Sequence, residues 1–299
     1  MRNRRPLLAA LVVLVPWVPG CRLPGGRGPI PQSLATCRQF SQQGIAALER
    51  QQWQQAESLL AKAVEACPVD VDARRSYAEA LWHRGARKEA ISQLEEAAAL
   101  ATEDATLRVR IAEMQLDCGR LEVARRRAEE ALDLDPKSSA AWAVRASTMR
   151  AAGDLRKALA DYHRALAGAP GDQAILLEIA ELYRQLNQPQ RALAALHRLA
   201  DTYAPGEEPQ RVLYLQGLAH VALARHGDAV ESFSTASLRG PPNPEVLYRL
   251  AEAQLALGRP AEAAAAAHQA LSLDPEHGPS RELLAGLEVV RAPGRPRQR

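Results

Sequence analysis

Aromatic residues, cysteines and net charge are all scarce in this sequence. Its 299 residues include two Phe, six Tyr, four Trp and four Cys, and the formal net charge is +3. Arg2, Arg4 and Arg5 account for that excess, because the first twenty residues contain no Asp or Glu. The rest of the chain has equal numbers of positive and negative charges, so it lacks the excess positive charge by which proteins attract nucleic acid. We therefore expect no nucleic-acid partner.

The motifs that carry catalysis or hold a metal ion are also missing. The sequence has no Cys-x-x-Cys pair, no Gly-x-Ser-x-Gly setting and no glycine-rich phosphate loop. His163, His197 and His268 recur at one place in a repeating pattern, but neighbours lie about one repeat apart, which is too far for a single metal ion. The sequence thus predicts no enzyme, no cofactor and no metal site.

What the chain does have is a period of 34 residues. Its rows begin at Cys37, Val71, Ala105, Ser139, Gln173, Gln210 and Pro244. The eighth column holds only Gly or Ala, and the twenty-seventh is Ala in every row except at Leu199. The twentieth column is alanine throughout, at Ala56, Ala90, Ala124, Ala158, Ala192, Ala229 and Ala263. Two helices approach closely only where side chains are small, so these columns predict repeated helix crossings.

Each row fits a helical hairpin. Two stretches with apolar residues at three- and four-residue spacing are separated by a short turn. The fifteenth column, where the first helix ends, is Gly in four rows and Asn187 in the fifth, as a left-handed residue requires. Prolines near column 32 end the second helix, at Pro68, Pro136, Pro170, Pro241 and Pro275.

This pattern resembles the tetratricopeptide repeat (TPR) family over residues 37–277. The resemblance implies an all-α, right-handed α-solenoid of about seven repeats: 37–70, 71–104, 105–138, 139–172, 173–209, 210–243 and 244–277. The fifth repeat has three more residues than the others, so we expect a loop or bend at 202–209. An amphipathic segment at 278–290 predicts a helix that caps the end of the solenoid.

The N-terminus carries the pattern of an export signal. A basic start and an uncharged apolar run at 6–19 predict a signal peptide over 1–20. Gly20 before Cys21 resembles a bacterial lipobox, which implies a lipid on Cys21; an uncleaved signal anchor is the alternative. We expect a Gly/Pro-rich tether at 21–36 and a basic disordered tail at 291–299. Both alternatives predict an exported, membrane-anchored protein at the periplasmic or extracytoplasmic face.

An oxidising compartment would permit a disulfide in the first repeat. Cys37 opens the first predicted helix and Cys67 closes the second, and those two ends meet in an antiparallel hairpin. The spacing therefore predicts a Cys37–Cys67 bridge, with unpaired thiols as the alternative. Cys118 has no evident partner cysteine for a disulfide.

In the TPR family the concave face, lined by the first helix of each repeat, usually binds the partner. Columns 2, 5, 9 and 12 should face inward, and they predict a groove. Its N-terminal part comprises Arg75, Glu79 and Trp82. Its C-terminal part is more apolar and comprises Leu177, Tyr214, Leu218, Val221, Tyr248, Glu252 and Leu255. The alternative is that Tyr214 and Tyr248 only fill space between helices. Four glutamates in column nine favour a partner segment with basic and apolar residues.

The sequence leads to a functional hypothesis. We expect a non-catalytic scaffold or adaptor at the bacterial cell envelope that binds a peptide or partner protein in the concave groove. In plan it resembles the bacterial TPR lipoproteins. The alternative is an accessory subunit of an envelope enzyme complex for peptidoglycan or glycan processing, or a protease adaptor. A homodimer through exposed terminal repeats is a further alternative.

Overall fold

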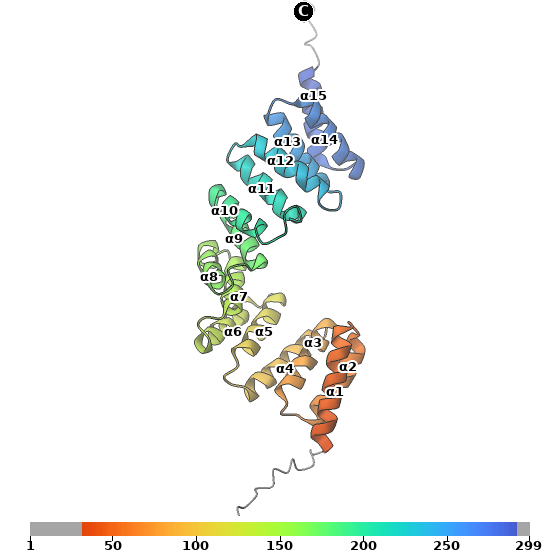
Figure 1. The fold of residues 1–299 in the computed structure, drawn as a ribbon, viewed down its shortest axis with the longest axis vertical. Coiled ribbons are helices and arrows are strands. Elements are labelled where there is room, and N and C mark those ends of the chain that lie inside the picture. The colour runs from red at the N-terminus through yellow and green to blue at the C-terminus, as the bar shows by residue number, and fades with distance from the viewer. Residues whose placement is uncertain (1–31, 292–299) are drawn as a thin grey trace, which may run out of the picture.

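The chain folds into a helical solenoid. The computed structural model describes residues 32–291, and within that range every regular element is a helix. Stacked in chain order, the helices form the superhelix seen in Figure 1. The fifteen helices are α1 (Gln32–Glu49), α2 (Trp53–Ala66), α3 (Val71–His83), α4 (Arg87–Leu100), α5 (Ala105–Asp117), α6 (Leu121–Leu134), α7 (Ser139–Ala151), α8 (Leu155–Gly168), α9 (Gln173–Gln185), α10 (Pro189–Ala200), α11 (Gln210–Ala222), α12 (His226–Leu238), α13 (Pro244–Ala256), α14 (Pro260–Leu273) and α15 (Gly278–Arg291).

The helix starts follow the sequence rows. From α3 to α13, each odd-numbered helix begins at the first residue of its row. The first repeat differs, because α1 begins at Gln32 and Cys37 lies in its second turn, so five residues of the expected 21–36 tether are helical. The predicted signal peptide, Cys21 and all of the basic tail after Arg291 lie outside the described residues.

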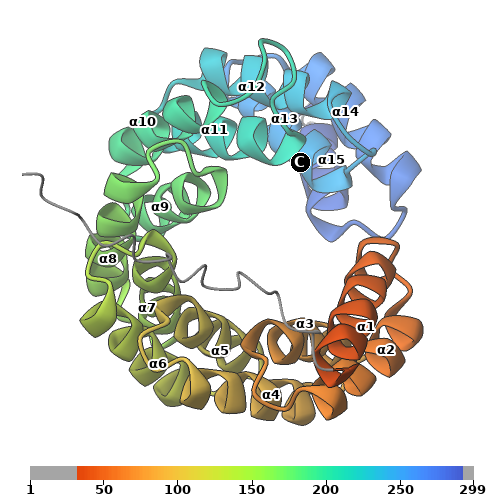
Figure 2. The same cartoon turned by 60° about the horizontal axis from the view of Figure 1, so that its bottom comes forward.

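The superhelix has an inner and an outer face. Viewed as in Figure 2, the odd-numbered helices line the inside of the turn and the even-numbered helices cover the outside. This is the arrangement that the columns predict, with the first helix of each repeat facing inward. The last helix, α15, closes the array: Leu287 is buried, and Leu283 and Leu284 pack beside it against the core of the seventh repeat.

Small residues set the distance between the two helices of each hairpin. All seven column-twenty alanines are at most 1% exposed. A Cβ atom added at Gly217 would lie 2.5 Å from Cε1 of Phe233, and one at Gly44 would lie 2.5 Å from Cγ of Leu60. Since real contacts of a Cβ atom are longer than this, these helices can approach only with no side chain at those positions.

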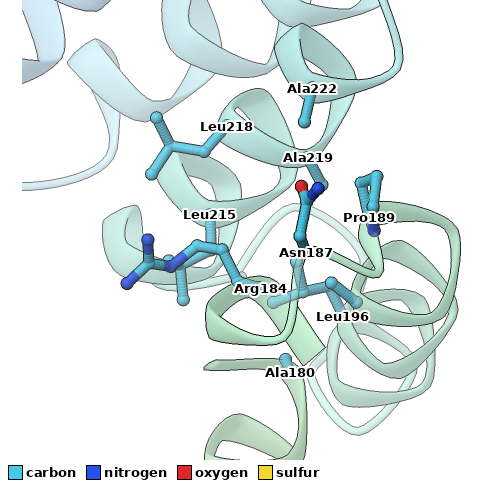
Figure 3. A pocket seen from close by; sticks show the side chains of 10 residues that line it. Ala180, Arg184, Asn187, Pro189, Leu196, Leu215, Leu218, Ala219 and Ala222 are labelled. Atoms are coloured by element: carbon cyan, nitrogen blue, oxygen red, sulfur yellow. The ribbon is translucent and has the colours of Figure 1, made fainter. Parts of the chain in front are cut away.

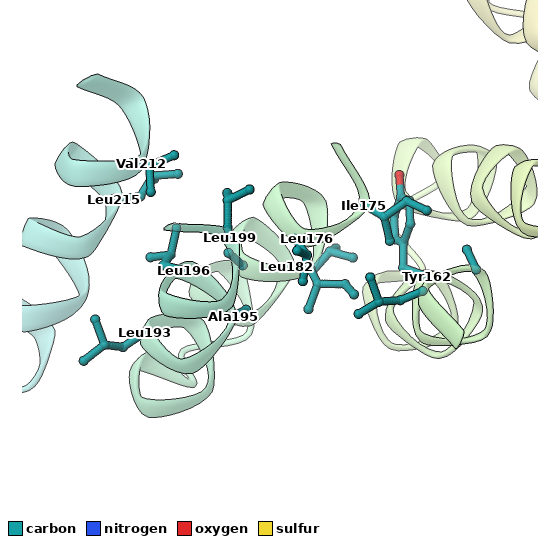
Figure 4. Packing of buried hydrophobic residues seen from close by; sticks show 14 of the residues in the cluster. Tyr162, Ile175, Leu176, Leu182, Leu193, Ala195, Leu196, Leu199, Val212 and Leu215 are labelled. Atoms are coloured by element: carbon teal, nitrogen blue, oxygen red, sulfur yellow. The ribbon is translucent and has the colours of Figure 1, made fainter. Parts of the chain in front are cut away.

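Large aliphatic side chains fill the remaining space. The most extensive cluster runs from α7 to α11, and Figure 4 shows its members meeting from α8, α9, α10 and α11. Leu196 and Leu199 of α10 pack there with Val212 and Leu215 of α11, across the connector 201–209. The expected break in the period is thus a loop, and the core continues past it.

Each hairpin turn requires a left-handed residue. In the fifteenth column Gly85, Gly119, Gly153 and Gly258 have φ between 73° and 86°, and Asn187 has φ 53°. Gln51 and Ala224 occupy the same column, with φ 59° and 55°. A left-handed conformation costs an L-residue roughly 1–2 kcal/mol. The first and sixth repeats therefore have strained turns.

We predict opposite effects of two substitutions in these turns. Ala224→Gly should raise the free energy of unfolding by about 1 kcal/mol, and Gly119→Ala should lower it by about 1 kcal/mol. No atom lies within 4 Å of a Cβ added at Gly119, so only the backbone conformation is tested there. Urea unfolding of both variants measures the effect, and a change of the same sign in both would contradict this account of the turns.

Two cysteines of the first repeat lie side by side. Cys37 is completely buried in α1, and Cys67, at the C-terminal cap of α2, packs against it. Both carry free thiols in this structure, and the Cys37 thiol donates to Oδ2 of Asp70 at 3.4 Å. Burial, with the neighbouring Cys67 and Asp70, raises the pKa of Cys37 to about 12. Cys37 therefore stays protonated near neutral pH, and the thiolate of Cys67 must start any bridge between them.

The Cys37–Cys67 disulfide remains a prediction. After oxidation with a glutathione redox buffer, peptide mapping without reductant should find the two cysteines in one linked fragment, while Cys118 stays free. A loop of about 30 residues closed by that bond should stabilise the first repeat by about 3–4 kcal/mol. The Cys67→Ser variant is the control, and equal urea midpoints for the oxidised and reduced wild type would contradict the stabilisation.

Candidate functional site

The predicted N-terminal part of the groove is held by ion pairs. Glu79 of α3 accepts two hydrogen bonds from Arg110 of α5, at 2.7 and 2.8 Å, and Arg110 also donates to Glu113 at 2.8 Å. These bonds, those to Glu79 above all, raise the pKa of Arg110. The Arg87 guanidinium lies over the Trp82 ring, with its carbon 5.5 Å from the ring centroid, in a cation–π contact. Arg75 is exposed. Glu79 and the Trp82 ring therefore already have partners within the chain, and Arg75 is the exposed member of the predicted set.

A second network ties the predicted tyrosines to carboxylates. The Tyr214 hydroxyl donates to Glu245 at 3.3 Å, and the Tyr248 hydroxyl donates to Glu252 at 2.7 Å. Arg249 lies between the two carboxylates and donates to each at 2.8 Å. Burial, followed by the bond to Glu252, raises the pKa of Tyr248 to about 12. Both tyrosines are therefore neutral at physiological pH and fixed in orientation.

The two tyrosines differ in how many core contacts their rings make. The Tyr214 ring lies 5.8 Å from that of Phe233 and contacts three buried clusters, so it fills space between repeats. Tyr248 meets the His277 ring edge-on at 5.7 Å. For Tyr214 the geometry favours the space-filling alternative. Removing its ring would disturb the fold, and Tyr214 is a poor probe of binding.

Two neighbouring hollows lie in the C-terminal half of the solenoid. The first, of about 30 Å³, lies between α9, α10 and α11, where the side chains in Figure 3 converge. The second, of about 190 Å³, lies between α11 and α13 and is lined by Leu218, Val221, His226, Arg249, Glu252, Ala253 and Ala256. Leu218 lines both, and we call the pair the C-terminal groove.

The C-terminal groove is mainly apolar and partly open. The first hollow is walled by Ala, Leu and Pro side chains, with Arg184 and Asn187 as its polar members. Val221 in the second hollow and Leu255 on α13 are each 39% exposed. Nδ1 of His226 is buried without a hydrogen-bond partner among the described residues. Such a surface suits an occupant with apolar side chains and a hydrogen-bond donor or acceptor.

The groove contains part of the predicted set and several residues that the columns did not predict. Leu218, Val221 and Glu252 come together, whereas Leu177 packs against the core and Tyr214 lines neither hollow. The unpredicted members of the first hollow are Ala180, Asn187, Pro189, Ala192, Leu196, Leu215, Ala219 and Ala222. They come from the junction of the fifth and sixth repeats, where the three-residue insertion was the only available sequence signal.

A third hollow, of about 440 Å³, lies on the inner face in the middle of the solenoid. We call it the central hollow. Its apolar lining includes Leu116, Ala140, Ala143, Val144 and Ile175. Its polar lining consists of Glu113, Asp117, Asp172, Ser139 and Ser147, from α5, α7 and the start of α9. The sequence did not predict this hollow, because three separate helices contribute to it.

The four column-nine glutamates are less available than their sequence positions suggest. Glu79 and Glu113 share Arg110, and Glu252 is bound by Arg249. Glu181 lies 2.8 Å from Arg184 and 3.6 Å from Arg211. The negative charge that these glutamates offer a partner is therefore reduced, and a preference for a basic segment needs further carboxylates outside that column.

Residues 32–291 contain no group of three or more His, Cys, Asp or Glu side chains that could hold a metal ion. In the same range, none of the helices is both long enough and apolar enough to cross a bilayer.

Comparison with known families identifies the repeat. Two family models, both described as tetratricopeptide repeat, match the chain. One matches residues 81–147 and 149–213, and the other matches residues 41–105 and 214–277. No curated protein sequence matches significantly.

Solved structures share the fold at low sequence identity. YrrB, described as a TPR protein with an unusual peptide-binding site, is 17% identical with a TM-score of 0.59, covering 64% of this chain and 97% of its own. PilW, described as a widely conserved type IV pilus biogenesis factor, is 17% identical with a TM-score of 0.63, covering 70% and 96%. The C-terminal part of a TPR protein from Cytophaga hutchinsonii is 14% identical with a TM-score of 0.64, covering 81% and 98%.

Proposed function

This chain belongs to the tetratricopeptide repeat family, and from that premise we propose that it is a non-catalytic scaffold that binds a segment of a partner protein in the C-terminal groove. Proteins of this family generally serve as interaction scaffolds. The observation that carries the proposal is the pair of neighbouring hollows that share Leu218 in their walls, with Val221 of the second hollow left partly exposed.

The groove suits a short extended or helical peptide better than a small cofactor. A space of about 30 Å³ holds little more than the tip of an apolar side chain, and the adjoining 190 Å³ holds a larger one. Anchoring by a few apolar side chains along a groove is a common mode of peptide recognition. The peptide-binding site in the description of YrrB supports the same use of the fold.

We further propose that the scaffold acts at the cell envelope, anchored by a lipid on Cys21. The support is the basic start, the apolar run at 6–19 and the Gly20-Cys21 pair. Further support is that PilW, which shares this fold, is described as a type IV pilus biogenesis factor. Such an analogy concerns architecture and leaves the pathway open.

Val221→Asp tests the groove. Replacing this apolar side chain by a hydrated carboxylate removes an apolar contact from the groove and should weaken binding of the partner by at least about tenfold. The matched control is Leu238→Asp, since Leu238 ends the outer helix α12 of the same repeat and is 83% exposed. Both variants and wild type would be used for affinity capture from detergent-solubilised membranes, with quantitative mass spectrometry. Equal capture by Val221→Asp and wild type would exclude the groove as the site.

Cys21→Ser tests the anchor. Without the sulfur the chain cannot be acylated there, so it should leave the membrane fraction, while the wild type stays and incorporates labelled palmitate. The groove is unaffected by this change, and capture of the partner in detergent should persist. Membrane association of the Ser variant equal to that of wild type would exclude lipidation as the anchor.

A further inference from the structure

The central hollow differs from the rest of the inner face in its electrostatics. Polar side-chain contacts join most neighbouring inner helices from α3 to α13. They are Arg110–Glu79 for α3 and α5, Arg150–Glu178 for α7 and α9, Arg211–Glu181 for α9 and α11, and Tyr214–Glu245 for α11 and α13. Within the described residues α5 and α7 have no such contact, and they meet through apolar side chains alone.

The missing contact leaves carboxylates facing uncharged side chains. On α5, Glu113 and Asp117 line the hollow, and on α7 the lining residues are Ser or small and aliphatic. Glu113 shares one guanidinium with Glu79, so the three groups together keep a negative charge. Asp117 is exposed and forms no ion pair with any described residue. No cationic side chain lines this hollow.

Asp117 also occupies an unfavourable place for stability. It is the last residue of α5, where the helix dipole carries partial negative charge. A carboxylate at a helix C-terminus is repelled by that dipole, so the fold gains nothing from this charge. A cation bound in the hollow would interact favourably with Asp117, with Glu113 and with the end of the helix.

We propose that the central hollow binds arginine or lysine side chains of an extended segment of the partner protein. This deepens the proposed function, because the hollow is a second subsite on the same inner face. The apolar lining at Leu116, Val144 and Ile175 would pack against the aliphatic part of such a side chain, and its charged end would reach Asp117 and Glu113. Asp172 is already engaged, since its Oδ1 accepts from the N–H of Ile175 at 3.0 Å.

The test uses two synthetic nonapeptides, one with three arginines separated by pairs of alanines and one with glutamates in place of the arginines. Fluorescence anisotropy with the full chain should detect binding of the basic peptide alone, weakening as salt rises. Asp117→Asn should weaken that binding about fivefold, and Asp117→Asn with Glu113→Gln about tenfold or more. The urea midpoint of Asp117→Asn should equal or exceed that of wild type.

Asp133→Asn is the matched control, because Asp133 is exposed and lies one residue before the end of α6 on the outer face. Its affinity for the basic peptide should equal that of wild type. Equal losses in Asp133→Asn and Asp117→Asn, or no binding of the basic peptide, would overturn the proposal. Binding that appears only after residues 292–299 are deleted would assign the hollow to the arginines of this chain's own terminus and overturn a partner as occupant.

The two proposals fail in different ways. If Val221→Asp abolishes capture of the partner while Asp117→Asn leaves it unchanged and the basic peptide does not bind, the C-terminal groove stands and the central hollow is excluded. If the basic peptide binds as expected while capture is insensitive to Val221→Asp, the groove is excluded and the basic subsite stands.

Discussion

The close approach of two helices in each hairpin is the constraint on which the rest of the structure depends. It is met by alanine or glycine in the eighth and twentieth columns, and Gly217 against Phe233 shows how little room remains. Because these contacts are repeated at a fixed interval, they determine which helices face inward and how successive hairpins stack. The inward columns are not constrained in this way and can vary in charge and size; they supply Leu218, Val221 and Glu252 to the candidate site, while Ala180 and Ala192 of the constrained columns also line it.

The sequence allowed the helix starts and turns to be predicted because they depend on residues that are rare elsewhere in a helix. Gly85 and Asn187 predict left-handed turns, and Pro189 predicts a helix start. The start of α1 was missed because the rows were placed by their repeated small residues and begin at Cys37, whereas the Gly/Pro-rich stretch already ends at Pro31. Prediction failed at Glu79 for another reason, because its partner Arg110 is 31 residues away in the sequence.

The hollows were beyond prediction for a different reason. Inward columns identified Leu218, Val221 and Glu252 correctly as neighbours, since all three follow from helical geometry. The volume between repeats depends on how far apart the stacked helices stand, and that depends on many side chains together. The central hollow illustrates this: each of its helices looks ordinary in sequence, and the hollow forms only where residues of α5, α7 and the start of α9 come together.

The connector 201–209 has a consequence for the integrity of the array. Leu196 and Leu199 on one side of it and Val212 and Leu215 on the other belong to one continuous apolar cluster. The two halves of the solenoid are therefore held together by noncovalent burial as well as by the peptide chain. A single proteolytic cut within the connector would separate the covalent chain into two fragments and leave that cluster intact. The fragments would remain associated as a nicked solenoid, so the covalent break alone would leave the first hollow of the C-terminal groove assembled.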